Sequence, residues 1–282
     1  MKKILERLTV FFIGLPLILS SVYFLPQYHF LFLHLEIFLV SAVAVIEVHA
    51  LLSRRIAVYS IPFFLIIGLV LPLASYLNML TVFPRTSYLI ILTALFYFIF
   101  FIEIFYSFSK PLNRSIQRMC SAVFIMFYPG FFMAFISGMT RWPSASNTIT
   151  IFLLMVFICD SMAWLCGMLF GKRNRGIIPA SPNKSLAGFI GGIIASVAAG
   201  LIAYLVFPET FGKSLAGSLF TGFCTALAAI IGDLVESILK RSADVKDSGA
   251  VILGRGGIMD SIDSILLGAP VFYLCYRFCI GL

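Results

Sequence analysis

The sequence predicts an all-α integral membrane protein that is polytopic, with about nine transmembrane helices and a cytoplasmic N-terminus. Of its 282 residues, 61% are hydrophobic and only 11% are charged, whereas a soluble domain is about 25% charged. The mean hydropathy is +1.06. Apolar runs recur along the chain at lengths near the ~20 residues that a helix needs to cross a hydrocarbon core of ~30 Å. These observations exclude an ordinary soluble globular domain.

The expected helices follow one another with short connections. The first comes directly after Lys2, Lys3 and Arg7, a basic start that also precedes signal peptides. No small-residue cleavage site follows its long apolar run, so we expect this segment to be retained as a first span. Within a few residues at each end, the nine segments are 8–26, 30–52, 56–77, 87–108, 119–139, 148–170, 186–207, 214–239 and 262–281.

The distribution of basic residues tests this count. If the N-terminus is cytoplasmic and nine spans alternate, sixteen of the twenty Lys and Arg residues fall in the cytoplasm. Such an excess is typical of cytoplasmic connections, and a missed or additional span would scramble it. Anionic lipids of the inner leaflet attract flanking basic residues, so the net charge of +8 calls for no nucleic-acid partner. The four that fall outside are Arg85, Arg141, Lys213 and Arg277.

We expect a functional division near residue 145. Residues 1–145 form an N-terminal membrane scaffold of about five spans, and residues 146–282 form a catalytic half of about four spans that is richer in Gly, Ala and Ser. In the seventh segment Gly188, Gly192, Ser196 and Gly200 occupy every fourth position, which places them on one helix face. Helix packing accounts for this face, and the same feature makes a homodimer plausible.

Three glutamates lie inside apolar segments of the first half: Glu36, Glu47 and Glu103. A carboxylate inside a bilayer is a functional candidate by default. However, Glu47 and Glu103 lie near the expected cytoplasmic ends of their spans and Glu36 lies near the outer interface, where a long side chain can reach polar surroundings. Both interpretations stay open, and Glu47 is the one for which we most expect a polar partner.

The stretch from Gly232 to Asp263 collects charge that the rest of the chain avoids, with five aspartates, one glutamate and four basic residues. On a helix Asp233, Glu236 and Lys240 fall on one face, at positions i, i+3 and i+7. The start of the last segment repeats the i, i+3 spacing with Asp260 and the final aspartate of the stretch. Two helix ends therefore present carboxylates with basic residues interleaved.

A glycine-rich loop, Gly254-Arg255-Gly256-Gly257, lies between these helix ends and has backbone amides that can approach an anion. Carboxylates mixed with Lys and Arg favour metal-assisted phosphate chemistry, because Mg²⁺ is held by one or two carboxylates plus substrate phosphates and basic side chains hold the remaining oxygens. An anionic phosphate nucleophile needs alignment and charge neutralisation but no general base, and this half has no histidine. A salt-bridged cytoplasmic loop would explain the basic residues, but acidic residues contribute little to topology.

These residues resemble the C-terminal signature of the phosphatidate cytidylyltransferase (CDP-diacylglycerol synthase) family. The signature spans roughly thirty residues with fixed spacings, so it is more specific than a glycine-rich loop alone. The resemblance covers the last half of the chain by motif and the first half only by its row of membrane helices. The matching residues are Gly232-Asp233, Glu236-Ser237, Lys240-Arg241, Lys246-Asp247, Gly256-Gly257, Asp260 and Asp263, with Asp160, Ser181-Pro182-Asn183-Lys184-Ser185 and Gly188 upstream.

The resemblance implies Mg²⁺-dependent transfer of CMP from CTP to phosphatidate, which gives CDP-diacylglycerol and pyrophosphate in phospholipid biosynthesis. It implies an active site on the cytoplasmic face of a bacterial inner (cell) membrane, among membrane lipids. Asp233 and Asp260 match the metal-holding aspartates, and whether a second cation binds is left open. The catalytic residues implied are Asp233, Asp260, Lys240, Lys246 and Asp247. The substrate-binding residues implied are Lys184, Ser181, Arg241, Arg255, Glu236, Asp263 and Asp160.

The chain departs from the family pattern at several positions. Arg255 stands where the family usually has His, and Ser261 where it has Arg. Upstream, the family's Lys-Lys-Thr-Trp-Glu-Gly is replaced by Asn183-Lys184-Ser185-Leu186-Ala187-Gly188, so that Ala187 stands in place of Glu. Arg255 can donate to phosphate but cannot accept a proton, and Ala187 lacks a carboxylate, so activity or substrate preference could differ. The alternatives are a related CTP-dependent membrane lipid or polyprenol kinase, and a non-catalytic or transport membrane protein. Against transport, the acidic residues cluster at one membrane face and not at the midplane.

Overall fold

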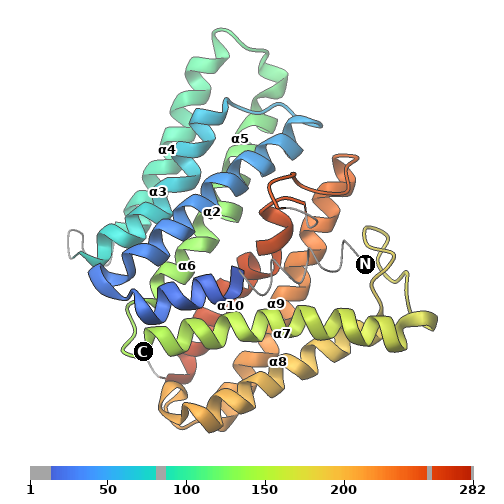
Figure 1. Cartoon of the computed structure of the whole chain (residues 1–282). Coiled ribbons are helices and arrows are strands. Elements are labelled where there is room, and N and C mark those ends of the chain that lie inside the picture. The colour runs from blue at the N-terminus through green and yellow to red at the C-terminus, as the bar shows by residue number, and fades with distance from the viewer. Residues whose placement is uncertain (1–13, 81–86, 253–255, 281–282) are drawn as a thin grey trace. The chain divides into compact units, whose positions relative to one another are not determined.

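The computed structural model describes residues 14–80, 87–252 and 256–280, and all its long elements are helices (Figure 1). The β contacts within these residues are two isolated bridges, Arg175 with Ser185 and Ile252 with Gly256. This confirms the all-α prediction. After an apolar helix, Gly14–Phe24, the long helices are α2 Gln27–Ser53, α3 Ile61–Met79, α4 Ser87–Ser107, α5 Ser115–Ile125, α6 Phe132–Met139, α7 Ala145–Phe170, α8 Leu186–Val206, α9 Leu215–Ser242 and α10 Met259–Ile280.

Eight spans in the described part of the chain are long and apolar enough to cross a membrane. They correspond to the second to ninth segments expected from the sequence. The first expected segment, 8–26, begins outside the described residues, so the count of nine and the orientation of the N-terminus stay predictions. The protein is therefore a multi-pass helical membrane protein.

Leu112–Met139, the fourth of these eight spans and the counterpart of the fifth expected segment, is one apolar unit made of several helical pieces. Between α5 and α6 the backbone forms a π-helical turn, Met126–Phe131, that contains Pro129. Proline has no N–H to donate and therefore interrupts the hydrogen-bond ladder of an α-helix. The following Gly130 packs against α3 so closely that an added Cβ would lie 2.7 Å from the carbonyl oxygen of Gly68. Apolar length predicted the span, but not this break.

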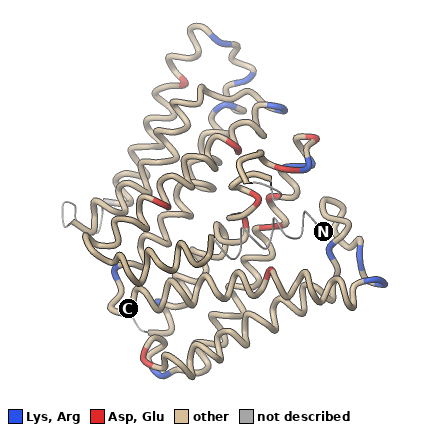
Figure 2. Tube along the Cα trace, viewed as in Figure 1, with Lys and Arg blue, Asp and Glu red and all other residues tan. Residues whose placement is uncertain are grey.

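Two compact units make up the chain, and each is discontinuous in sequence. One contains Met1–Ser137 with Ser242–Met259, and the other contains Gly138–Arg241 with Asp260–Leu282. In both units Figure 2 shows long helical stretches without charged residues, with most charges at helix ends and in connections. The expected functional division near residue 145 stays a prediction.

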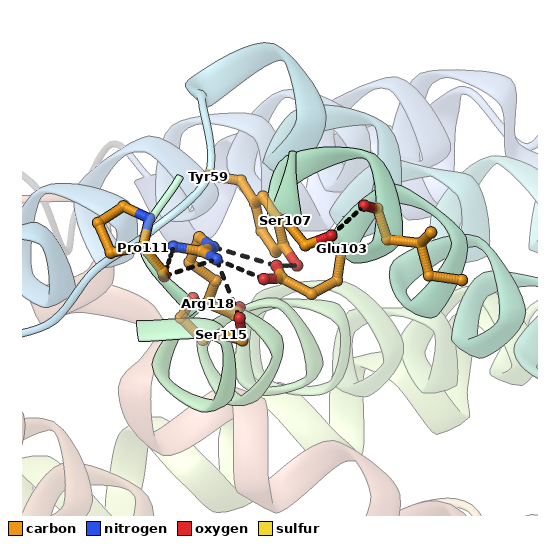
Figure 3. A network of polar contacts seen from close by, with 8 residues as sticks. Tyr59, Glu103, Ser107, Pro111, Ser115 and Arg118 are labelled. Atoms are coloured by element: carbon orange, nitrogen blue, oxygen red, sulfur yellow. Dashed lines mark hydrogen bonds and ion pairs between the residues drawn. The ribbon is translucent and has the colours of Figure 1, made fainter. Parts of the chain in front are cut away.

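A buried ion pair joins α4 and α5 in the first unit (Figure 3). Arg118 donates to both carboxylate oxygens of Glu103, from Nε at 3.0 Å and from Nη2, and the Tyr59 hydroxyl donates to the same carboxylate at 2.5 Å. Burial and the adjacent carboxylate raise the pKa of Tyr59, so its hydroxyl stays a donor. Arg118 also reaches the carbonyl of Pro111 at 3.4 Å and the hydroxyl of Ser115 at 3.2 Å. Glu103 is thus satisfied inside the protein and not at the lipid interface.

Small residues set the helix packing of the second unit. An added Cβ on Gly188 would lie 2.6 Å from the carbonyl oxygen of Ala163 in α7, and one on Gly200 would lie 2.7 Å from that of Ser218 in α9. This confirms that the small-residue face of α8 allows close backbone approach. Because helices of the same chain occupy that face, it offers no separate support for a homodimer.

Large apolar side chains cover much of the outer surface of these helices. Tyr97 and Phe105 of α4 and Ile202 and Leu205 of α8 are all exposed. In water, contiguous apolar surface of this kind drives association, whereas in a bilayer it faces hydrocarbon. Composition and surface therefore agree with a membrane location.

Candidate active site

Five carboxylates gather in the second unit: Asp160 of α7, Asp233 and Glu236 of α9, and Asp260 and Asp263 of α10. We call them the carboxylate cluster. Asp263 is buried and interacts electrostatically with Asp160, Asp233 and Glu236, and Glu236 interacts with Asp260. The structure therefore brings together five of the residues that the sequence assigned to one site.

Two lysines pair with the carboxylate cluster. The Lys184 ammonium lies 2.5 Å from Oδ2 of Asp233, and both side chains are partly exposed, at 22% and 37%. The Lys240 ammonium lies 2.5 Å from Oδ1 of Asp260 and also pairs with Glu236, one helical turn earlier, whose side chain is fully buried. A buried carboxylate needs such a partner, because an unpaired buried charge is costly. One pair thus lies near the surface of the unit and the other lies deeper.

A tight turn positions Lys184. The Lys184 amide donates to the Ser181 carbonyl at 3.1 Å, and Pro182 occupies the second turn position, where its fixed φ is favoured. The next residue, Ser185, is the N-cap of α8, and its hydroxyl accepts from the Gly188 amide at 3.1 Å. Ser181 therefore accepts the hydrogen bond of the turn. The turn and the Ser185 cap together set the position of Lys184.

Close contact of α9 and α10 brings their aspartates together. An ideal Cβ on Gly232 would lie 3.1 Å from the Asp263 carbonyl carbon and 3.3 Å from Ser264 Cα, and closer still to the Asp263 carbonyl oxygen. Ser264 then joins two carboxylates: its hydroxyl donates to Asp160 at 3.1 Å and its amide donates to Asp263 at 2.7 Å. Sequence reasoning missed Ser264, and its only signal was its position directly after Asp263.

The donor set of the carboxylate cluster suits a cation that is shared with a substrate. In the described residues no basic side chain forms an ion pair with Asp263, and no group of three or more His, Cys, Asp or Glu residues is arranged as a cage that could hold a metal ion. Mg²⁺ does not need such a cage, because it keeps waters and is held by one or two carboxylates plus substrate phosphates. Asp233 and Asp260 already face positive ammonium groups. This donor set is compatible with an ion that also binds substrate phosphates, and it forms no closed structural metal centre in the described residues.

Four other residues were assigned to the site from the sequence: Arg241, Lys246, Asp247 and Arg255. Arg241 donates from Nε to the carbonyl of Ala180 at 3.3 Å, beside the turn that carries Lys184. Lys246 and Asp247 are exposed and belong to the first unit, so their roles stay predictions. Arg255 lies outside the described residues.

Ala187 and Ser261, two of the departures from the family pattern, lie in the described residues. Ala187 is exposed in the first turn of α8. The Ser261 hydroxyl is buried and makes no hydrogen bond to another described residue. Neither residue replaces the charge that the family pattern has at its position, so the charge within the described site comes from the carboxylate cluster and its two lysines.

The fold and the site define a class: a helical multi-pass membrane protein with a cluster of carboxylates that is paired with lysines. The chain belongs to the cytidylyltransferase family, whose model matches residues 5–279. This confirms the resemblance found in the sequence.

Curated relatives match about half of the chain. It is 35% identical over 159 residues to the phosphatidate cytidylyltransferase of Thermotoga maritima, covering 55% of this chain and 58% of that protein. It is 37% identical over 153 residues to the phosphatidate cytidylyltransferase of Helicobacter pylori, covering 52% and 53%. It is 36% identical over 128 residues to the phosphatidate cytidylyltransferase of Haemophilus influenzae, covering 44% of each. The chain thus spans about half the length of these relatives.

Proposed function

We propose that this chain transfers CMP from CTP to phosphatidate and so makes CDP-diacylglycerol and pyrophosphate. Family membership and the names of the relatives support this reaction. The observation that carries it in the structure is the carboxylate cluster with its two lysines, since an excess of carboxylates beside fixed ammonium groups suits a metal ion and phosphate oxygens together.

The reaction needs alignment more than proton transfer. An oxygen of the phosphatidate phosphate forms a bond to the α-phosphorus of CTP, while the bond from that phosphorus to the oxygen bridging toward the β-phosphate breaks. Pyrophosphate leaves with the bridging oxygen and both bonding electrons. Because the attacking phosphate is already anionic, the protein's task is to hold two negatively charged reactants in line and to neutralise developing charge.

Lys184 and Lys240 are the residues that we propose bind phosphate oxygens. Each ammonium group has three donors and is held by an aspartate in the structure, at 2.5 Å in both cases. Glu236, buried beside Lys240, fixes the direction of that ammonium group. Lys246, Asp247 and Arg255 stay in the proposal as further contacts around the nucleotide, on the strength of the signature alone.

Asp233 and Asp260 are the carboxylates that we propose hold Mg²⁺. When bound, the ion would offset negative charge on the phosphate oxygens of CTP and of the leaving pyrophosphate. Asp263 is buried among other carboxylates without a basic partner in the described residues, and a bound cation would offset the cost of placing a negative charge there. Whether a second cation binds is part of the same proposal.

The site is proposed to face the cytoplasm of a bacterial inner membrane. The support is the excess of Lys and Arg in alternate connections, together with relatives from bacteria. The proposed partners are CTP, phosphatidate and membrane lipids, with no nucleic acid. A homodimer stays in the proposal without a structural argument.

Release of pyrophosphate tests the proposal. The purified chain in mixed micelles is given CTP and Mg²⁺ with phosphatidate, diacylglycerol or a polyprenol as acceptor, and only phosphatidate is expected to give pyrophosphate. A phosphorylated lipid with CDP as the other product would instead indicate a kinase. Asp233→Asn and Asp260→Asn are expected to lose at least about 10²- to 10³-fold in rate, a loss typical of removing one electrostatic group from an active site. Asp244→Asn, in an exposed ion pair with Arg55, is the matched control and is expected to keep its rate.

A further inference from the structure

Glu47 of α2 is a buried carboxylate, 5% exposed, and it is bound by the segment that leads into α10. Its Oε1 accepts from the Ile258 amide at 3.0 Å. Its Oε2 accepts from the Met259 amide at 2.8 Å and from the Ser248 hydroxyl at 3.1 Å. All these residues belong to the first unit. A carboxylate that only reached for the lipid interface would be exposed and would not collect three protein donors.

Two glycines make room for this carboxylate. A Cβ added to Gly249 would lie 2.8 Å from Glu47 Cδ, and one added to Gly257 would lie 2.6 Å from the same atom, with carboxylate oxygens closer still in both cases. Any side chain at either glycine would therefore displace the Glu47 carboxylate or the backbone around it. The surroundings of Glu47 therefore depend on glycine at these two positions as well as on the hydrogen bonds.

The Glu47 carboxylate is stabilised by neutral hydrogen-bond donors. None of the ion pairs in the described part of the chain includes it. Hydrogen bonds to an ionised group are about twice as strong as neutral ones, and a buried charge without partners costs several kcal/mol in effect. The same three hydrogen bonds therefore also fix the positions of Ser248, Ile258 and Met259.

The held positions adjoin the proposed transfer site in the sequence. Ser248 directly follows Asp247, and Met259 directly precedes Asp260. The glycine-rich segment was expected to offer its amides to a substrate anion. The two amides that follow its glycine pair, those of Ile258 and Met259, bind an anion of the protein itself.

We propose that Glu47 is a positioning residue for cytidylyl transfer: it holds the chain at Ser248 and at Ile258 and Met259, and so fixes the residues directly adjoining Asp247 and Asp260. The proposal rests on the proposed function. Glu47 itself touches no substrate. Its effect comes from preorganisation, since a misplacement of about 1 Å in a catalytic group can cost about 10²-fold in rate.

Glu47→Gln tests the proposal with little change of shape. One carboxylate oxygen becomes an NH₂ group, which cannot accept from an amide or a hydroxyl. The matched control is Glu36→Gln, which removes the other carboxylate of α2, an acceptor for the Ser21 hydroxyl at 3.0 Å. The first readout is amide hydrogen exchange of Ile258 and Met259 in the full chain in detergent, which needs no activity. Loss of charge-assisted bonds is expected to speed this exchange about 10- to 100-fold in Glu47→Gln and not in Glu36→Gln.

The second readout is the steady-state rate with CTP and phosphatidate. Glu47→Gln is expected to lower kcat about 10²-fold and to change KM for CTP less than about threefold, because a group that does not touch substrate acts on the alignment of the transition state. Gly249→Ala keeps the carboxylate but displaces it, and is expected to show the same two effects. It replaces Glu47→Gln in the test if that variant does not fold.

Unchanged amide exchange of Ile258 and Met259 in Glu47→Gln and in Gly249→Ala would overturn the proposal. Faster exchange in these variants with kcat unchanged would overturn it as well. Faster exchange together with the fall in kcat supports it. A wild-type chain that is inactive on every acceptor would overturn the proposed function and with it the role in transfer, while the exchange result still decides whether Glu47 fastens the segment.

Discussion

Gly232→Ala places a methyl group in the contact that joins the helices carrying Asp233 and Asp263. The new Cβ would lie 3.1 Å from the Asp263 carbonyl carbon and 3.3 Å from Ser264 Cα. All the atoms that it meets are backbone, so no side chain can rotate away. Restoring ordinary contact distances of about 3.5 Å or more requires α9 and α10 to separate by about 1 Å at this level.

A shift of this size is expected to cost activity more than stability. Overpacking typically destabilises a fold by about 1–3 kcal/mol, whereas a displacement of about 1 Å between aligned groups can lower a rate about 10²-fold. The measurements are the initial rate of pyrophosphate release at saturating CTP and the thermal midpoint in detergent.

Gly222→Ala is the matched control in the same helix. Its Cβ would lie 2.8 Å from the Ser196 carbonyl oxygen and 3.2 Å from Val197 Cα, so it also overpacks against backbone. It lies ten residues, or about 15 Å along the helix, from Gly232. We expect a similar fall in thermal midpoint but less than about a tenfold loss of rate. Equal rate losses in the two variants, or none in Gly232→Ala, would refute the argument that this helix contact aligns the site.

Two further predictions concern the first unit. Arg118→Met leaves Glu103 buried and unpaired and is expected to cost about 3–5 kcal/mol of unfolding free energy, whereas Lys213→Met, in an exposed ion pair, should cost under about 1 kcal/mol; denaturant unfolding in detergent measures both, and equal small losses would contradict a structural role for the buried pair. In a variant without other cysteines, Ala250→Cys, at an exposed position, is expected to react with a membrane-impermeant thiol reagent only after the cells are opened, and labelling of intact cells would reverse the assigned topology.

Much of the fold could be predicted because it depends on the length and composition of apolar runs. A run of about 20 apolar residues has few alternatives to a membrane helix, and eight of the expected segments are helices in the structure. The π-helical turn at Pro129 could not be placed in this way. Its geometry depends on the close contact of Gly130 with α3, which is a tertiary feature without periodicity in the sequence.

The sequence predicted that the charged residues of the candidate site group together, but not how they pair. The signature spacing named Asp233, Glu236 and Lys240, and the helical period placed them on one face. That Lys184 pairs with Asp233, and that Lys240 pairs with both Glu236 and Asp260, depends on how helices distant in sequence pack. Glu47 was open to two interpretations for the same reason. The sequence around a carboxylate near a helix end is the same whether that carboxylate faces lipid headgroups or accepts from backbone amides about two hundred residues later.

The position of the transferred phosphorus tests the central claim most directly. The purified chain is incubated with Mg²⁺, phosphatidate and CTP that carries radiophosphorus either at the α-phosphate or at the γ-phosphate, and the lipid extract is counted, with Asp233→Asn alongside. Cytidylyl transfer predicts that label from the α-phosphate enters the lipid product and label from the γ-phosphate leaves as pyrophosphate, with neither event in Asp233→Asn. Label from the γ-phosphate in the lipid, or none from the α-phosphate, would contradict it.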